Sequence, residues 1–158
     1  MTKIAIVFYS TFGHVTKLAT AIKKGVQSVP GVQAELYQVK ETLSEEVLTK
    51  LHAPPKSDEY ARRELIGKPC GIFFSCGSRG GGQEVTATST TPFIAHLGML
   101  FALRGSILES SDEMHGCSLW GSGTATNSDR SRQSSTLELT VAEMQGKNFA
   151  EITEKLSA

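Results

Sequence analysis

The sequence has no excess of charge of either sign. Its 16 Lys and Arg residues balance 16 Asp and Glu residues, so the formal net charge is zero. Proteins that bind nucleic acid or an anionic membrane usually carry a basic patch or a large positive charge. We therefore expect neither of these as the main partner.

Long apolar runs and paired cysteines are also absent. No apolar stretch approaches the length of about 20 residues that a membrane-spanning helix needs. Lys3 is followed by only a strand-length apolar run, which does not match a signal peptide. Cys70, Cys76 and Cys117 are an odd number without metal-type spacing, which indicates free thiols in a reducing compartment. We therefore expect a cytoplasmic protein without a membrane span.

Segments with strand patterns alternate with amphipathic segments along a chain whose 158 residues suit one domain. The residues predict strands over 3–9, 32–39, 71–76 and 99–103, and helices over 15–26, 44–51, 85–97 and 135–156. This order is typical of a doubly wound parallel sheet. Pro92 should kink or restart the third helix, with Thr90 or Thr91 as the cap of a second segment.

Residues 116–131 are rich in Gly, Ser and Thr and are predicted to form a long loop. Trp120 in that loop could pack in the core or against a flat ligand. Ser135 and Glu138 have the spacing of a capping box, so they should open the last helix.

The most informative stretch is 1–14, where a buried strand leads through Ser10-Thr11-Phe12-Gly13-His14 into the first helix. The first N–H groups of a helix have no internal partner, and the helix dipole favours an anion there. The hydroxyls of Ser10 and Thr11 add donors, and Gly13 allows close approach of the backbone. The turn therefore predicts a phosphate site. An ordinary turn with Ser10 or Thr11 as N-cap is the alternative.

A glycine-rich segment, 77–84, follows the strand over 71–76. In open α/β sheets, ligands bind beyond the carboxyl ends of the strands, so this loop is a candidate wall of the same site. A flexible loop before a helix is the alternative.

Four motifs together resemble the WrbA-type NAD(P)H:quinone oxidoreductases, a flavodoxin-like FMN family, and most of all its fungal members. They occur in the family's order, at 8–15 (FYSTFGHV), 75–84 (SCGSRGGGQE), 95–99 (AHLGM) and 121–133 (GSGTATNSDRSRQ). The resemblance covers residues 1–55 and then 67 to the C-terminus. It implies a flavodoxin-like fold, bound FMN, NAD(P)H as co-substrate, two-electron reduction of a quinone, and a homo-oligomer.

The resemblance and the two turns predict the residues that bind the cofactor. They are Ser10, Thr11, Phe12, Gly13, His14, Val15, Ser75, Cys76, Gly77, Ser78, Arg79, Gly80, Gly81, Gln83 and His96. No catalytic side chain or metal is expected, because the flavin itself carries out the hydride chemistry.

This sequence also departs from the family pattern. Family members carry a further strand, a flavin-contacting loop of the form Thr-x-Thr/Arg-Phe-Gly and a helix, and nothing in 56–68 resembles them. We therefore expect a four-stranded sheet in which the strand at 71–76 lies directly beside the first strand. Leu97 replaces the second of two family histidines, and 127–132 replaces Gly-Gly-Asp-Gly-Ser-Arg.

Two functions follow from the resemblance and its departures. In the first, the chain is an FMN-dependent quinone oxidoreductase. In the second, it is a shortened relative that has lost tight flavin binding and acts as an interaction protein or is inactive. The phosphate turn favours the first, whereas the missing loop and Leu97 favour the second.

Overall fold

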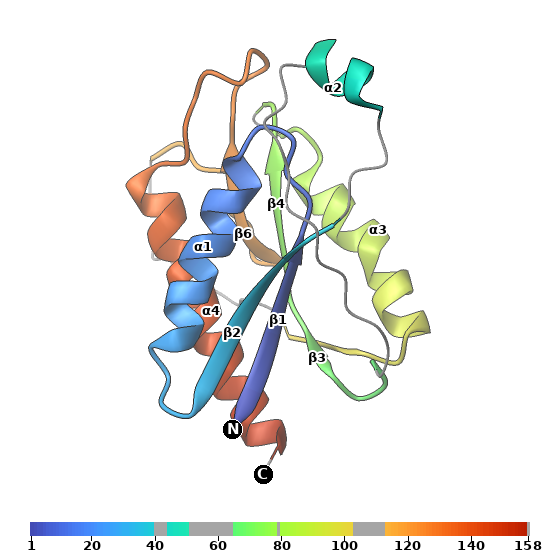
Figure 1. The fold of residues 1–158 in the computed structure, drawn as a ribbon, viewed down its shortest axis with the longest axis vertical. Helices are drawn as coiled ribbons and strands as arrows, with labels where there is room; N and C mark the ends of the chain where they lie inside the picture. Colours follow the sequence, from blue (N-terminus) through green and yellow to red (C-terminus); the bar gives the residue numbers. More distant parts are fainter. Residues whose placement is uncertain (40–43, 51–64, 79, 103–112, 158) are drawn as a thin grey trace.

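The computed structural model describes residues 1–39, 44–50, 65–78, 80–102 and 113–157, which form an α/β fold with parallel strands. In Figure 1, helices α1 (His14–Gln27) and α4 (Thr136–Ser157) lie together on one side of the strands, and α3 (Gln83–His96) lies on the other. The short helix α2 (Glu45–Lys50) confirms the helix expected over 44–51. No helix of the described ranges is long and apolar enough to cross a membrane.

Strands β1 (Thr2–Phe8) and β2 (Val32–Gln38) form a parallel pair, as predicted. Their register runs from Thr2 opposite Val32 to Phe8 opposite Gln38. Alternate β1 side chains, those of Ile4, Ile6 and Phe8, are buried against α1 and α4. The opposite face of β1 is open, since Val7 is 57% exposed. Both faces of a strand in a parallel sheet are normally covered by helices. This face of β1 is therefore less well covered than is usual.

Helices α1 and α4 pack so closely that two glycines are required at their contact. A Cβ atom on Gly25 would collide with the backbone carbonyl of Glu143, and one on Gly146 would collide with the backbone of Ile22. Leu18, Ala19, Val26, Val141 and Ala142 are fully buried around this contact. Gly146 of α4 therefore packs directly against α1.

The strand expected over 71–76 is replaced by two shorter strands on either side of Gly71. Strand β3 (Pro69–Cys70) is followed after Gly71 by β4 (Ile72–Cys76), where we expected one strand over 71–76. Strand β5 (Leu100–Phe101) pairs in parallel with β3, and β6 (Gly121–Ala125) pairs in parallel with β4. The strand expected over 99–103 is therefore shorter than predicted, and its Leu103 lies outside the described residues.

The prediction that 116–131 forms one long loop is wrong, because β6 lies inside it and all five of its residues are buried. The sequence Gly-Ser-Gly-Thr-Ala has few of the β-branched and aromatic residues that mark strands. Its small residues instead allow the neighbouring backbone segments to approach closely. A Cβ on Gly121 would collide with the carbonyl of Ile72 in β4, and one on Gly123 would collide with that of Gly116.

The predicted single sheet with β4 directly beside β1 is also not what the described residues form. Three separate two-stranded ladders are present, β1–β2, β3–β5 and β4–β6, and none joins β1 to β4 within the described ranges. Helix α1 contacts β1 and β2 as well as β4 and β6. Helix α1 therefore packs on both the β1–β2 and the β4–β6 ladders.

Helix α3 runs without interruption through Pro92, so the predicted restart does not occur. The hydroxyls of Thr90 and Thr91 donate to the carbonyls of Thr86 and Ala87 one turn earlier, and cap no second segment. Gly98, with φ of 69°, follows the end of the helix. The N–H of Met99 bonds the carbonyl of Ile94 there, as in a Schellman motif.

The glycine contact between α1 and α4 leads to a test of stability. Replacing a helix-interior glycine by alanine usually stabilises a helix. In Gly25→Ala, however, the new methyl group meets the Glu143 backbone, so we expect a loss of about 2 kcal/mol from overpacking. Urea unfolding measures this change. The exposed Thr20→Ala in the same helix is the control and should cost little, and equal stability of Gly25→Ala and wild type would contradict the close packing.

Candidate functional site

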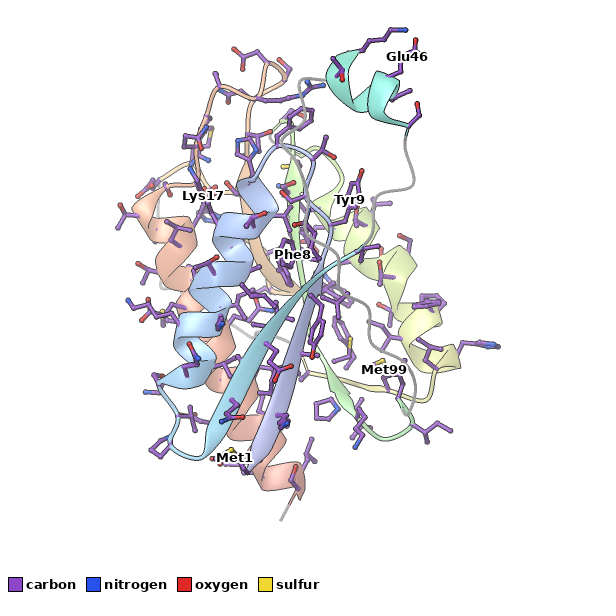
Figure 2. All side chains as sticks on the ribbon, viewed as in Figure 1. Met1, Phe8, Tyr9, Lys17, Glu46 and Met99 are labelled. Carbon is purple, nitrogen blue, oxygen red and sulfur yellow. The ribbon has the colours of Figure 1, made fainter. Side chains whose placement is uncertain are left out.

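A cavity of about 310 Å³ opens at the carboxyl ends of β1, β4 and β6. It is lined by three segments that each follow or end a strand: Tyr9, Ser10, Thr11, Phe12, His14 and Val15 after β1, Ser75, Cys76 and Gly77 at β4, and Thr126, Asn127, Ser128 and Arg130 after β6. Figure 2 shows the labelled Phe8 and Tyr9 at the end of β1, with Lys17 on α1. The cavity therefore spans both the β1–β2 and the β4–β6 ladders.

The turn between β1 and α1 has the geometry of an anion site. Gly13 caps the helix in the left-handed conformation, with φ of 84°, and its N–H donates to Ser10 Oγ at 3.1 Å. The first helical bond runs from Lys17 N–H to the Gly13 carbonyl. The N–H groups of His14, Val15 and Thr16 thus have no acceptor inside the helix. The first turn of α1 carries no acidic residue that would repel an anion.

His14 supplies an independent sign of a ligand in this cavity. It is 6% exposed and lines the cavity, and its Nε2 atom has no hydrogen-bond partner among the residues that the structure describes. A buried polar atom without a partner costs free energy. A ligand oxygen in the cavity would satisfy it, so His14 Nε2 marks a place for a polar ligand group beside the first turn of α1.

The turn after β4 holds the backbone close to the cavity. The Gly81 N–H donates to the Ser78 carbonyl at 3.0 Å, and Gly80 and Gly82 have positive φ values of 64° and 93°. The Cys76 thiol donates to the same Ser78 carbonyl at 3.1 Å. Burial raises the pKa of Cys76 above its ordinary value, so the cavity faces a neutral thiol and not a thiolate.

The loop after β6 closes the third side of the cavity. Asn127 and Arg130 both have φ of 65°, a conformation that residues other than glycine rarely adopt. The Arg130 guanidinium lies over the Phe12 ring, with Cζ 4.1 Å from the ring centroid. This cation–π contact links the loop after β6 to the turn after β1.

Glu138 anchors the segments around that loop to α4. It is fully buried, and its pairing with Ser135 confirms the predicted capping box, with Ser135 N–H donating to Oε2 at 2.8 Å and Glu138 N–H donating to Ser135 Oγ at 3.2 Å. The Arg132 guanidinium lies 3.0 Å from both carboxylate oxygens. Further donors to the carboxylate are the N–H groups of Gly116 and Ala125 and the hydroxyl of Thr124.

The structure brings some, but not all, of the predicted site residues together around the cavity. Ser10, Thr11, Phe12, His14, Val15, Ser75, Cys76 and Gly77 line the cavity, and Gly13 holds the turn behind it. Ser78, Gly80 and Gly81 lie in the adjoining turn and Gln83 begins α3, but none of the four is among the lining residues. Arg79 lies outside the described residues. Trp120 stacks on Phe101 at 6.0 Å between ring centroids and does not line the cavity.

His96 lies away from the other predicted residues. It is exposed at the last position of α3, a helix of 14 residues that begins beside the glycine turn. At 1.5 Å per residue, the helix separates His96 from that turn by about 20 Å. His96 therefore does not line this cavity.

Sequence reasoning missed Tyr9 and four residues after β6: Thr126, Asn127, Ser128 and Arg130. Recognising 121–125 as a buried strand would have revealed them. That strand places residues 126–130 at the same end of the parallel strands as the turn between β1 and α1. Its small residues gave no strand pattern, so the loop behind it was not assigned to the site.

Comparison with known proteins finds close relatives, although no protein-family model matches. The chain is 38% identical to NAD(P)H quinone oxidoreductase YCP4 of Candida albicans, over 98% of this chain and 69% of that protein. It is also 38% identical to quinone-oxidoreductase QR2 of Triphysaria versicolor, over 98% and 97% of the two chains. A probable NAD(P)H dehydrogenase (quinone), FQR1-like 2 of Arabidopsis thaliana, is 36% identical over 98% and 72%.

The alignments also confirm that an internal segment is missing. The match to QR2 extends over 198 residues and nearly the whole of both proteins, whereas this chain has 158 residues in all. At least 40 aligned positions of the relative therefore face no residue of this chain.

The buried Glu138 carboxylate should make stability depend on pH. Burial raises its pKa, but the hydrogen bonds from Ser135, Thr124, Arg132 and Gly116 outweigh burial and hold the pKa below its usual value. The folded state then binds this proton less readily than the unfolded state. Its contribution is complete above about pH 4.3, the ordinary glutamate value, and is lost as the pH falls through the lowered folded pKa.

We therefore expect Glu138→Gln to cost about 3 kcal/mol near neutral pH, because it leaves Arg132 without its buried partner. The loss should shrink in acid, where the wild-type carboxylate is itself protonated. Urea unfolding across this pH range measures both effects. Glu143→Gln, which removes an exposed ion pair with Lys24, is the control and should cost less than about 1 kcal/mol. The same pH dependence in wild type and Glu138→Gln would refute this role.

Proposed function

The chain belongs to the WrbA-type, flavodoxin-like family of NAD(P)H quinone oxidoreductases, and on that premise we propose that it is an FMN-dependent enzyme that reduces quinones with NAD(P)H. The main support for the cofactor assignment comes from His14, which lines the cavity at the N-terminus of α1. Its buried Nε2 atom has no hydrogen-bond partner among the described residues. We also propose a cytoplasmic location, in keeping with the free thiols of Cys70, Cys76 and Cys117.

The donor set around the β1–α1 turn fits a phosphate group. Backbone N–H groups at His14, Val15 and Thr16 point out of the first turn of a helix, and the helix dipole favours a dianion there. Ser10 accepts the Gly13 N–H with its Oγ and keeps its own hydroxyl hydrogen for the ligand. In the described ranges, no Asp or Glu side chain lines the cavity to oppose the negative charge.

The other two walls fit a flat ring better than a second charged group. The edge formed by Ser75, Cys76 and Gly77 offers a thiol, a hydroxyl and backbone. Because the Cys76 pKa is raised, the thiol stays neutral and does not repel electron-rich atoms of a ring. We propose that the flavin ring lies against this edge while the phosphate lies on the β1–α1 turn.

When bound, FMN supplies the chemistry of accepting and donating a hydride, which the protein side chains cannot supply. The chain's own residues bind and orient it. The first turn of α1 fixes the phosphate end, and the β4 edge positions the ring beside the opening, where a nicotinamide and then a quinone can approach it. Neither a nucleophile nor an acid–base pair is needed from the protein.

The phosphate assignment predicts where FMN perturbs the protein. On addition of FMN, the amide NMR signals of residues 11–15 should shift, because their N–H groups gain an anionic acceptor. The amide of Gly31, which lies beyond the opposite end of the β1–β2 pair, should stay in place. Riboflavin, which lacks the phosphate, should shift the signals of residues 11–15 less than FMN does. Unchanged signals at these residues in saturating FMN would refute the phosphate site.

The missing segment should make FMN binding weaker than in full-length relatives. The cavity of about 310 Å³ is at the small end of the range of ligand pockets, and the family loop that would cover one side of the ring is absent. Leaving on the order of 100 Å² of apolar ring surface in water forgoes roughly 2.5 kcal/mol, which is more than tenfold in affinity.

We therefore expect the protein to purify largely colourless and to need excess FMN for quinone reduction by NAD(P)H. Isothermal calorimetry on flavin-free protein, together with turnover assays over a range of added FMN, measures both. A full-length relative prepared in the same way is the control and should keep its flavin. Tight stoichiometric binding by this chain, with full turnover at trace FMN, would contradict the expected effect of the missing segment.

A further inference from the structure

Arg130 is in a conformation that its own residue type does not favour. Its φ of 65° lies in the left-handed region, where an L-residue with a side chain pays a cost that glycine does not. Such strain persists only when surrounding contacts hold it, and it clusters at binding sites. The contact that Arg130 makes is therefore of interest.

The contact is with the β1–α1 turn. The Arg130 guanidinium stacks over the Phe12 ring, with Cζ 4.1 Å from the ring centroid. Phe12 lies between Thr11 and Gly13 in the turn that we assign to phosphate, and Arg130 and Phe12 line the same cavity. Stacking uses the face of the guanidinium and leaves its N–H groups at the rim free to point at an acceptor.

Few charged side chains surround the cavity. Among the described lining residues, Arg130 is the one Lys or Arg, and no Asp or Glu is present. The neighbouring Asp129 carboxylate accepts hydrogen bonds from the Ser131 N–H at 3.1 Å and the Ser131 hydroxyl at 2.7 Å. His14 lines the same cavity, and its buried Nε2 has no hydrogen-bond partner within the described part of the chain. A dianionic group on the first turn of α1 would satisfy both.

We infer that Arg130 is a phosphate-recognition residue, which holds a phosphomonoester between its guanidinium and the first turn of α1. This inference deepens the proposed function, because it assigns a specificity residue to the same cavity. Arg130 distinguishes a phosphorylated flavin from an unphosphorylated one. It contributes to binding at the end of the ligand away from the ring, so the missing family loop does not affect it.

The test compares Arg130→Gly with Lys147→Gln. Both substitutions remove one positive charge, but Arg130 lines the cavity whereas Lys147 is exposed on α4. Both variants should stay folded, because glycine relieves the backbone strain at position 130 and Lys147 is a surface residue. FMN and riboflavin are titrated against wild type and both variants, and flavin fluorescence is read at low and at moderate salt.

At low salt, Arg130→Gly should weaken FMN binding by about tenfold, since one partly exposed charge-assisted contact is lost. Riboflavin affinity should not change, so the preference for FMN over riboflavin falls. Added salt should narrow the difference between wild type and Arg130→Gly. Lys147→Gln should keep the wild-type preference, and Arg130→Lys should keep most of it. An unchanged preference in Arg130→Gly would overturn the inference while leaving the proposed FMN function intact.

A second measurement covers the case in which neither flavin binds, which would refute the proposed function. Inorganic phosphate is then titrated into wild type and Arg130→Gly, and the amide NMR signals of His14, Val15 and Thr16 are followed. Saturable shifts in wild type that weaken in Arg130→Gly would support the phosphate role of Arg130 without FMN. Equal shifts in the two proteins, or none in either, would overturn it.

Discussion

The close contact between helices α1 and α4 is the constraint on which the rest of the structure depends. Within the described ranges, no strand ladder joins β1–β2 to β4–β6. Helix α1 contacts strands of both ladders, and α4 contacts β1 and β6. Gly25 and Gly146 let the two helix backbones meet, so the buried side chains of β1 share one core with both helices. The helices thus do what a central strand does in a complete doubly wound sheet.

The position of the candidate site follows from this arrangement of helices and ladders. Its cavity lies where the two ladders meet, with the turn after β1 on one side and the ends of β4 and β6 on the other. The phosphate turn is local to β1 and α1 and needs nothing from the segment that the relatives have and this chain lacks. The loop after β6 is held by Glu138 and Arg132 at the start of α4. On the proposed function, the parts that would hold a phosphate are present in this chain, whereas less of a flavin ring would be covered.

Sequence reasoning succeeded where a local pattern determines the structure. The β1 strand, the turn at Gly13 and the start of α1 follow from apolar periodicity and helix-terminus chemistry over neighbouring residues, and so does the capping box of Ser135 and Glu138. It failed where contacts between distant parts of the chain determine the local structure. The strand β6 exists because small residues fit against β4, which no strand propensity encodes. The roles of Asn127 and Arg130 in the cavity depend on that strand and were missed with it.

We propose that the first turn of α1 binds the phosphate of FMN while the cavity leaves the flavin ring partly open. A crystal structure of the protein grown with excess FMN would test both parts of this proposal. We expect the phosphate within hydrogen-bond distance of the His14, Val15 and Thr16 amides, with the ring against Ser75, Cys76 and Gly77. FMN bound elsewhere, or an empty cavity in crystals saturated with FMN, would contradict it.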